Sequence, residues 1–113
     1  MSKTKLIALD MDGTLLNDDG VVTSYTHDVI QQALKQGVEV VLSTGRPLSL
    51  CTTFSEELNL PSYIITSNGA EIWTVEHELI ERHPIKSKKI EALWQLGNER
   101  ILHMWLVARV QMV

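Results

Sequence analysis

The chain is poor in several residue types, and each shortage narrows what the protein can be. It has a single cysteine, which excludes an internal disulfide and favours a reducing compartment. Its formal net charge of −4 gives no general electrostatic reason to bind nucleic acid or an anionic membrane. No signal-peptide pattern opens the chain, and the apolar stretch at 101–113 is too short to span a bilayer as a helix. We therefore expect a cytoplasmic protein with no nucleic-acid and no membrane partner.

What remains is the composition of one small globular domain. Hydrophobic residues make up 44% of the sequence and charged residues 21%, both ordinary values. A chain of 113 residues forms one domain at most, near the low end of the usual size range. Because the overall charge is acidic, any affinity for phosphate must come from a local arrangement of groups.

Strand and helix patterns alternate along the first 70 residues, which favours a parallel sheet with crossover helices. We expect strands at 5–9, 38–42 and 63–65. The first two show no alternation of polar and apolar residues, which predicts burial on both faces. Beyond Ala70, residues 72–75 and 79–81 resemble a short antiparallel hairpin.

Three helices are expected between or after these strands. The first follows a cap at Thr23 or Ser24 and ends at Gly37. Its predicted apolar face consists of Tyr25, Val29, Ile30, Ala33 and Leu34. The second begins with Pro47 in its first position and reaches about Leu58. The third spans 87–96, and 101–113 is interpreted as one or two further strands.

Two acids follow the first predicted strand, Asp10 and Asp12, with Gly13 directly after them. The carboxyl end of a strand opens into a loop, so both acids can turn towards one pocket although strand side chains alternate. Gly13 permits a backbone conformation that a Cβ would resist. This arrangement suits a nucleophilic carboxylate with an acid/base partner. The alternative is a pair of turn-forming acids that bond their own backbone.

Three segments together resemble the haloacid-dehalogenase (HAD) superfamily of phosphotransferases. They are Asp10-Met11-Asp12-Gly13-Thr14-Leu15-Leu16, Val40-Val41-Leu42-Ser43-Thr44-Gly45-Arg46-Pro47 and Ile64-Ile65-Thr66-Ser67-Asn68-Gly69-Ala70. The likeness is greatest to the Cof-type branch, metal-dependent phosphatases of small phosphorylated metabolites. It extends from Lys5 into the helix around Ile90 and weakens after Ile101.

The resemblance implies the fold class and the domain organisation. We expect an α/β, Rossmann-like (HAD-type) three-layer parallel sheet, incomplete, with the start of an α+β cap. Residues 1–82 would form the amino-terminal half of the core, and residues 83–113 the truncated beginning of the cap.

The candidate catalytic residues are the two acids. Asp10 would attack phosphorus to form an aspartyl-phosphate. Asp12 would protonate the leaving oxygen and then deprotonate the attacking water. Both would lie at the carboxyl ends of parallel strands, where open α/β sheets bind ligands.

The candidate substrate-binding residues follow the second and third strands. Thr44 would donate its hydroxyl to a phosphoryl oxygen, and backbone amides near Gly45 and Arg46 would help to hold the charge. For Arg46 two interpretations stay open, a solvent salt bridge and a phosphate-facing role. Asn68 is either a turn former or, as the resemblance implies, part of the active-site rim.

Mg²⁺ is the cofactor that the resemblance implies, with the Asp10 carboxylate and the Asp12 backbone carbonyl as ligands. A hard cation would offset the repulsion between a phosphate and an aspartate. The family's motif lysine and later acidic motif are absent from this sequence. Lys86, Lys88 and Lys89 are interpreted as a solvated helix face rather than as that lysine.

The function predicted from the sequence is Mg²⁺-dependent hydrolysis of a small phosphorylated metabolite, with the chain as an amino-terminal portion of the enzyme. The alternative is an inactive fragment or an anion-binding module without turnover. A receiver domain is less consistent, since its acceptor aspartate follows the third strand, where this chain has Thr66-Ser67-Asn68. An incomplete sheet also leaves the strand at 5–9 as an edge, which predicts self-association, element swapping or marginal stability, unless the chain was cut from a longer protein.

Overall fold

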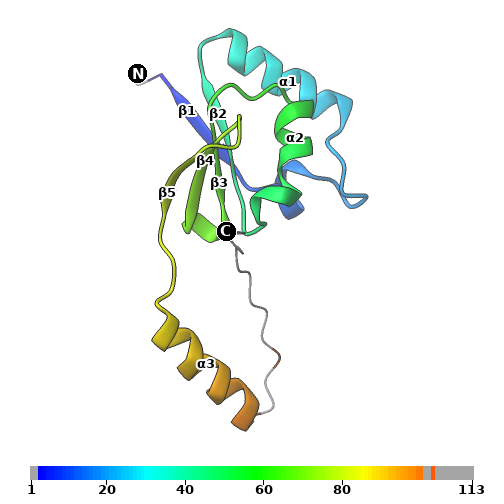
Figure 1. Ribbon diagram of the computed structural model, residues 1–113. Coiled ribbons are helices and arrows are strands. Elements are labelled where there is room, and N and C mark those ends of the chain that lie inside the picture. Colours follow the sequence, from blue (N-terminus) through cyan, green and yellow to red (C-terminus); the bar gives the residue numbers. More distant parts are fainter. Residues whose placement is uncertain (1–2, 101–102, 104–113) are drawn as a thin grey trace. The chain divides into compact units, whose positions relative to one another are not determined.

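The computed structural model describes residues 3–100 and 103 (Figure 1). The chain divides into two compact units, residues 1–82 and residues 83–113, and each is described by itself. The interpretation of the second unit as the beginning of a cap stays a prediction. The strands expected in 101–113 lie outside the described residues, apart from His103.

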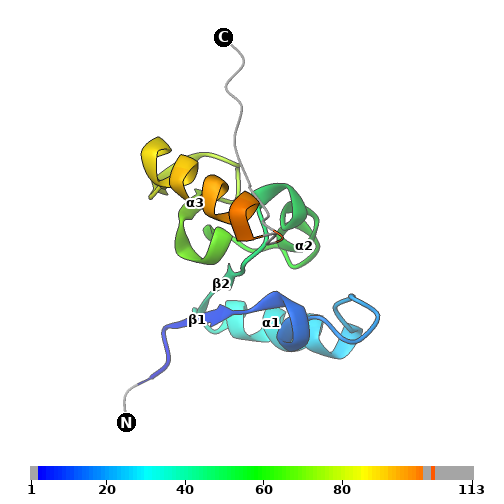
Figure 2. The same cartoon turned by 90° about the horizontal axis from the view of Figure 1, so that it is seen from below.

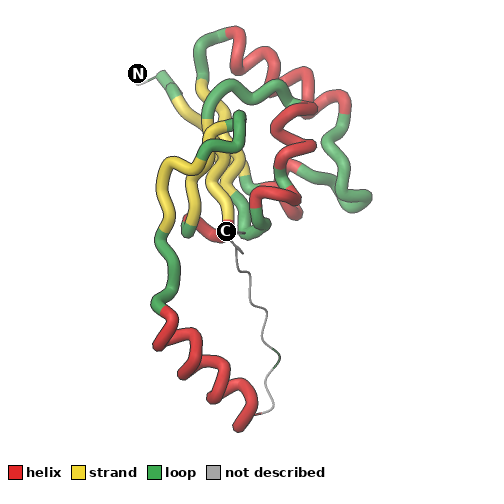
Figure 3. The backbone as a smooth tube through the Cα atoms, in the orientation of Figure 1, coloured by secondary structure: helices red, strands yellow, loops and turns green. Residues whose placement is uncertain are grey.

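A five-stranded mixed sheet organises the first unit (Figure 3). Its strands, in spatial as well as chain order, are β1 (Leu6–Leu9), β2 (Glu39–Ser43), β3 (Tyr63–Thr66), β4 (Glu71–Thr74) and β5 (Leu79–Arg82). β1, β2 and β3 run parallel, whereas β4 and β5 continue the sheet as an antiparallel hairpin. The three parallel strands and the hairpin predicted from the sequence are thereby confirmed.

The two ends of the first helix have the capping residues that the sequence predicted. α1 (Ser24–Lys35) is capped by Thr23, whose hydroxyl oxygen accepts from the Thr26 amide at 3.2 Å. Gly37 follows α1 with a φ of +80°, a left-handed conformation typical of a helix C-terminus.

The segment after β2 bends before it becomes α-helical. A 3₁₀ turn at Leu48–Leu50 precedes α2 (Thr52–Glu57), with Pro47 just before the turn. The prediction of one continuous helix beginning at Pro47 is therefore wrong. The Leu50 amide donates to the Pro47 carbonyl at 3.0 Å, the tighter bonding pattern of a 3₁₀ turn.

α1 and α2 lie on the same face of the sheet, as both views of the ribbon show (Figures 1 and 2). This follows from the strand order, because β1, β2 and β3 step in one direction and right-handed crossovers then put each helix on the same side. Within residues 3–82 the fold therefore has two layers, and the third layer of the predicted architecture has no counterpart there. The core between sheet and helices includes the buried side chains of Met11, Leu42, Cys51, Leu58 and Ile64.

The first strand departs from the expectation of two buried faces. Leu9 pairs with Leu42 of β2 and packs against the core. Leu6 and Ala8 point to the opposite face, because strand side chains alternate, and both are exposed. Leu6 is 53% exposed. The prediction that both faces of β1 are buried was wrong. An apolar run shows only that a strand can be buried, and no described helix covers the face that carries Leu6 and Ala8.

The predicted apolar face of α1 is also only partly correct. Ile30 is buried, and Ala33 and Leu34 pack against the core. Tyr25 is 79% exposed and Val29 46% exposed, so the outer part of the predicted face meets solvent.

The second unit contains one described element, α3 (Ser87–Arg100), which extends the predicted helix by a turn. Leu93, Trp94 and Leu96 are each about half exposed. In the part of the chain that the structure describes, no helix is long and apolar enough to cross a membrane.

Candidate active site at the carboxyl ends of the parallel strands

The two acids lie on a single wide turn directly after β1. The Leu15 amide donates to the Asp10 carbonyl at 3.1 Å, and Gly13 has the left-handed φ of +76° that the sequence suggested. Met11 and Leu15 are buried, whereas Asp10 and Asp12 are exposed. The apolar residues thus anchor the turn in the core and leave the acids at its surface.

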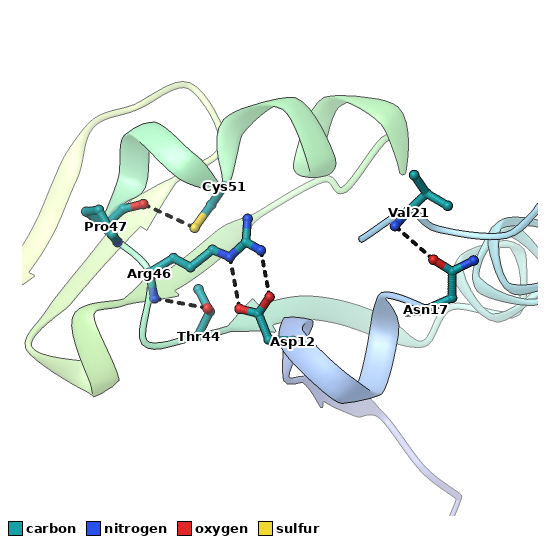
Figure 4. A network of polar contacts seen from close by, with 7 residues as sticks. All are labelled: Asp12, Asn17, Val21, Thr44, Arg46, Pro47 and Cys51. Carbon is teal, nitrogen blue, oxygen red and sulfur yellow. Dashed lines mark hydrogen bonds and ion pairs between the residues drawn. The ribbon is translucent and has the colours of Figure 1, made fainter. Parts of the chain in front are cut away.

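A second turn follows and leads into α1. The Asn17 side-chain oxygen accepts from the Asp19 amide at 3.0 Å. It also accepts from the Val21 amide at 3.1 Å (Figure 4). Gly20 has a φ of +73°. This is the self-bonding behaviour expected of an Asn in a turn, and it fixes the loop beside the acids.

Thr44 comes immediately after β2 and is only 4% exposed. Its amide donates to the Ile65 carbonyl at 3.0 Å, and its side-chain oxygen accepts from the Arg46 amide at 3.1 Å. A hydroxyl that accepts one bond still has its own proton to donate. Thr44 is therefore held in place with a donor remaining.

Arg46 binds Asp12 through both arms of its guanidinium (Figure 4). Nε donates to Oδ2 at 2.9 Å and Nη2 to Oδ1 at 2.6 Å. Such fork-to-fork pairs combine charge with fixed geometry. The guanidinium also lies over the Phe54 ring, 5.6 Å from its centroid. Of the two interpretations left open for Arg46, the described structure therefore contains a salt bridge, made to a candidate catalytic acid.

The ion pair changes the protonation behaviour of both partners. The hydrogen bonds from Arg46 hold the pKa of the Asp12 carboxyl below its usual range. The same bonds raise the pKa of Arg46. Asp12 is thus a carboxylate in this arrangement, and the neutral acid is disfavoured as long as both bonds persist.

The loop after β3 is bonded to the loop after β2. The Asn68 amide donates to the Thr44 carbonyl at 3.1 Å, and the Ser67 amide to the Arg46 carbonyl at 3.0 Å. Ser67, Asn68 and Gly69 have consecutive φ values of +51°, +55° and +89°. Two non-glycine residues in this region are strained, and such strain persists only where surrounding bonds hold it.

Gly45 makes this contact between loops feasible. A Cβ at this position would lie 2.9 Å from the Asn68 side-chain oxygen, closer than real Cβ atoms approach. A residue with a Cβ at position 45 would therefore force the Asn68 side chain to shift, so the glycine is favoured by the neighbouring loop rather than by its own φ. The sequence did not reveal this reason, because it depends on a residue 23 positions away in the sequence (68 − 45).

Asp10 differs from Asp12 in having no described partner. It is exposed, and its side chain forms no hydrogen bond or ion pair with another residue of the described chain. Both of its oxygens are therefore available to a ligand. Carboxylate and carbonyl oxygens are the donors that Mg²⁺ prefers, so the chemistry of Asp10 and of the Asp12 carbonyl fits that ion.

The described residues supply few further metal ligands. Among residues 3–100 and 103, no three His, Cys, Asp or Glu side chains are grouped so that they could hold a metal ion. Lys86, Lys88 and Lys89 are exposed, in keeping with a solvated helix face. Cys51 is fully buried, its Sγ donates to the Pro47 carbonyl at 3.3 Å, and burial raises the pKa of its thiol.

Most predicted site residues meet at one end of the sheet. The register pairs Leu9 with Leu42, so Asp10 and Thr44 both follow the carboxyl ends of adjacent parallel strands. Asp12, Thr44, Gly45, Arg46 and Asn68 are linked by the bonds and contact described above. Phe54 was missed, because nothing in the sequence marks it as the ring against which Arg46 rests.

Three parallel strands with paired acids after the first and a Thr-Gly-Arg loop after the second define a Rossmann-like domain of the kind found in phosphate-handling enzymes. A model of the haloacid dehalogenase-like hydrolases matches residues 7–113. The chain belongs to this family, as its three motifs predicted.

Relatives and solved structures agree with this assignment. The chain is 44% identical to "5-amino-6-(5-phospho-D-ribitylamino)uracil phosphatase YcsE" of Bacillus subtilis, over 89% of this chain and 41% of the relative. It is 39% identical to "Putative phosphatase YxeH" of the same organism, over 84% of this chain and 37% of the relative. A haloacid dehalogenase-like hydrolase from B. subtilis superimposes with a TM-score of 0.78 at 34% identity, over 87% of this chain and 34% of that one. The chain thus spans about two fifths of the length of these curated relatives.

Proposed function

We propose that this chain is the nucleophile-bearing portion of a Mg²⁺-dependent phosphatase that hydrolyses a small phosphorylated metabolite through an aspartyl-phosphate. The observation that carries the proposal is the convergence of Asp12, Arg46 and Thr44 at the sheet end where Asp10 is exposed. A structural turn alone would not need a buried threonine with a spare donor beside a forked acid–guanidinium pair.

In the first half-reaction an Asp10 oxygen attacks phosphorus, a new O–P bond forms, and the ester P–O bond breaks. The leaving oxygen takes a proton from Asp12. The Thr44 hydroxyl donates to a phosphoryl oxygen and stabilises the charge that develops there. Asp12 must be protonated for this step, so its two bonds to Arg46 have to be released when substrate enters.

In the second half-reaction Asp12 is the carboxylate that accepts a proton from water. The water oxygen attacks phosphorus, and the bond between phosphorus and the Asp10 oxygen breaks, which frees phosphate and restores Asp10. The arrangement with Arg46 bonded to Asp12 suits this base form, because the guanidinium disfavours protonation of the carboxyl. The second half-reaction leaves Asp12 protonated, so between turnovers Asp12 would release this proton to solvent when it pairs with Arg46, and it would take up a proton from solvent when an anionic substrate draws Arg46 away.

Mg²⁺ would be held by the Asp10 carboxylate and the Asp12 backbone carbonyl. When bound, it would reduce the repulsion between the substrate's phosphate and Asp10. Two protein oxygens form a weak site even for an ion that keeps several waters. We therefore expect the 113-residue chain by itself to bind Mg²⁺ weakly and to hydrolyse phosphate esters little.

The substrate class is a phosphate monoester of a small metabolite. The relative with 44% identity is described by its name as a 5-amino-6-(5-phospho-D-ribitylamino)uracil phosphatase, which makes this polyol phosphate the first substrate to test. The candidate residues of this chain contact the phosphoryl group, which all such substrates share.

The second candidate function is an anion-binding module without turnover. It is favoured by the lack, among residues 3–100 and 103, of a third acidic side chain close enough to complete a metal site. Such a module would bind phosphate without Mg²⁺, and it would not need Asp10.

The test is a transplant into the B. subtilis YcsE protein, replacing its matching 101-residue portion with this chain. We expect Mg²⁺-dependent release of phosphate at a kcat/KM within about 100-fold of the parent enzyme. Asp10→Asn should lower kcat at least about 1000-fold, because the nucleophile acts in both half-reactions.

Asp19→Asn is the matched control, since it removes an acid nearby that bonds the turn only through its backbone amide. It should leave kcat/KM nearly unchanged. A transplanted protein that is folded and monodisperse but hydrolyses nothing, or one whose activity survives Asp10→Asn, would contradict the proposal. Metal-independent binding of phosphate to the chain would support the module instead.

A further inference from the structure

Three side chains of the β4–β5 hairpin form a closed cluster at the end of the first unit. Arg82 Nε donates to Glu71 Oε1 at 2.8 Å, and Trp73 Nε1 donates to Glu71 Oε2 at 3.0 Å. The Arg82 guanidinium lies over the Trp73 ring, 6.0 Å from its centroid. Each of the three thus contacts the other two, and both oxygens of Glu71 are used.

The cluster is shielded well enough to be more than a surface ion pair. The Arg82 and Glu71 side chains are 27% and 21% exposed, and Trp73 is 5% exposed. Exposed pairs contribute little because water screens them and long side chains lose entropy on pairing. Here an aromatic ring covers the guanidinium and donates to the same carboxylate, which holds the geometry.

The cluster lies where the first unit ends and the second begins. Arg82 is the last residue of β5 and of the first unit, and the second unit begins at His83. From His83 to Lys86 the described chain has neither helix nor strand. Glu71, at the other side of the cluster, directly follows Ala70 of the Asn68-Gly69-Ala70 loop and pairs in register with Thr66.

One nitrogen of the Arg82 guanidinium has no partner in this cluster. Arg82 Nη2 is buried and has no hydrogen-bond acceptor among the described residues. Buried polar groups normally find a partner, and an unpaired one calls for an explanation such as an ordered water. The guanidinium is therefore held by Glu71 and Trp73 even though one of its nitrogens gains nothing from the position.

We propose that Glu71, Trp73 and Arg82 form a hinge clamp, which fixes the point where the chain leaves the first unit. With the clamp closed, backbone motion of the second unit begins at His83 and does not enter β5 or the loop that carries Asn68. The use of this hinge in phosphatase turnover rests on the proposed function, but the clamp itself does not.

The experiment measures backbone order along the full 113-residue chain by ¹⁵N relaxation and amide hydrogen exchange. In the unaltered protein, backbone order parameters should stay at about 0.85 through Arg82 and fall beyond it. In Glu71→Gln the fall should begin before Arg82, and exchange at 79–82 should quicken about tenfold or more. Exchange in β1, β2 and β3 should stay unchanged.

Glu78→Gln is the matched control, because Glu78 lies in the same hairpin and its side chain has no bond in the described structure. It should shift neither the order parameters nor the exchange. Arg82→Lys is the second variant, for use if Glu71→Gln fails to fold; it keeps the charge but loses the Nε donor, and it should loosen the same residues. Unchanged exchange at 79–82, or an equal acceleration in all strands, would overturn the clamp.

These measurements involve neither metal nor phosphate. If the transplant into YcsE shows no activity while 79–82 loosen as expected, the phosphatase proposal fails and the clamp stands. If the transplant is active while exchange at 79–82 is unchanged in both variants, the clamp fails and the phosphatase proposal stands.

Discussion

β1 and β2 are similar as sequences and different as parts of the structure. Both are short apolar runs that precede a polar loop, and every residue of β1 pairs with one of β2. Yet Val40, Val41 and Leu42 of β2 are all buried, whereas β1 alternates between exposed and half-buried residues. The difference arises because β2 has a strand on each side and β1 lies at the edge. An apolar sequence pattern shows that a strand can be buried. Whether its side chains are buried depends on the neighbouring strands and helices.

The largest effect should come from trimming one leucine in each strand. Leu42→Ala, at a fully buried position, should lower the free energy of unfolding by about 3 kcal/mol, since it removes apolar contacts and leaves a cavity. Leu6→Ala, at a position 53% exposed, should cost about 0.5 kcal/mol or less. Urea denaturation checks both. Equal losses would mean that the outer face of β1 is covered in solution.

The next largest effect should be on self-association through the edge strand β1. Among the described residues, β1 has an unpaired backbone edge and an apolar face that no helix covers, a combination that invites pairing with another chain. Leu6→Lys should weaken association about tenfold, measured by light scattering across a concentration series. Val29→Lys, at an exposed position on α1 rather than on a strand edge, is the matched control and should do less. A monodisperse monomer at every concentration would refute the prediction.

The smallest expected effect is a change in the pKa of Asp12, which lies in the loop after β1 and is bonded to Arg46 in the loop after β2. Arg46→Met should raise the pKa of the Asp12 carboxyl towards its ordinary value, because the guanidinium bonds that stabilise the carboxylate are lost. A carboxyl whose pKa is lowered by folding adds stability above the ordinary aspartate range and loses it as the pH falls through its folded-state pKa. The pair's contribution should therefore vanish on acidification.

A ¹³C NMR titration of the Asp12 carboxyl measures this shift. Lys35→Met is the control, since Lys35 is an exposed cation on α1 without a bond to Asp12. It should leave the titration of Asp12 in place. An unchanged pKa in Arg46→Met would mean that the two loops are not joined in solution.

Much of the fold could be predicted because its signals are local. The three parallel strands, the hairpin and the cap at Thr23 each depend on residues within a few positions of one another. The predictions that were wrong concerned neighbours. Pro47 precedes a 3₁₀ turn, Tyr25 meets solvent and β1 has an open face, and none of these is encoded in a local pattern.

The candidate site divides in the same way. The Asp-x-Asp turn with its left-handed Gly13 was expected from adjacent residues. The bond from Arg46 to Asp12 joins residues 34 positions apart, and the sequence left the role of Arg46 open. The catalytic and binding roles of these residues remain predictions.

The sequence by itself determined the family, the order of the elements and the position of the acids at a strand end, because periodicity, capping and motif spacing act over short stretches of chain. Only the tertiary structure decided which apolar residues are covered, which side chain a Cβ at position 45 would displace, and with which acid Arg46 pairs. These properties depend on atoms that are distant in sequence and adjacent in space, and close packing, excluded volume and directed hydrogen bonds act only between groups that the fold has brought together.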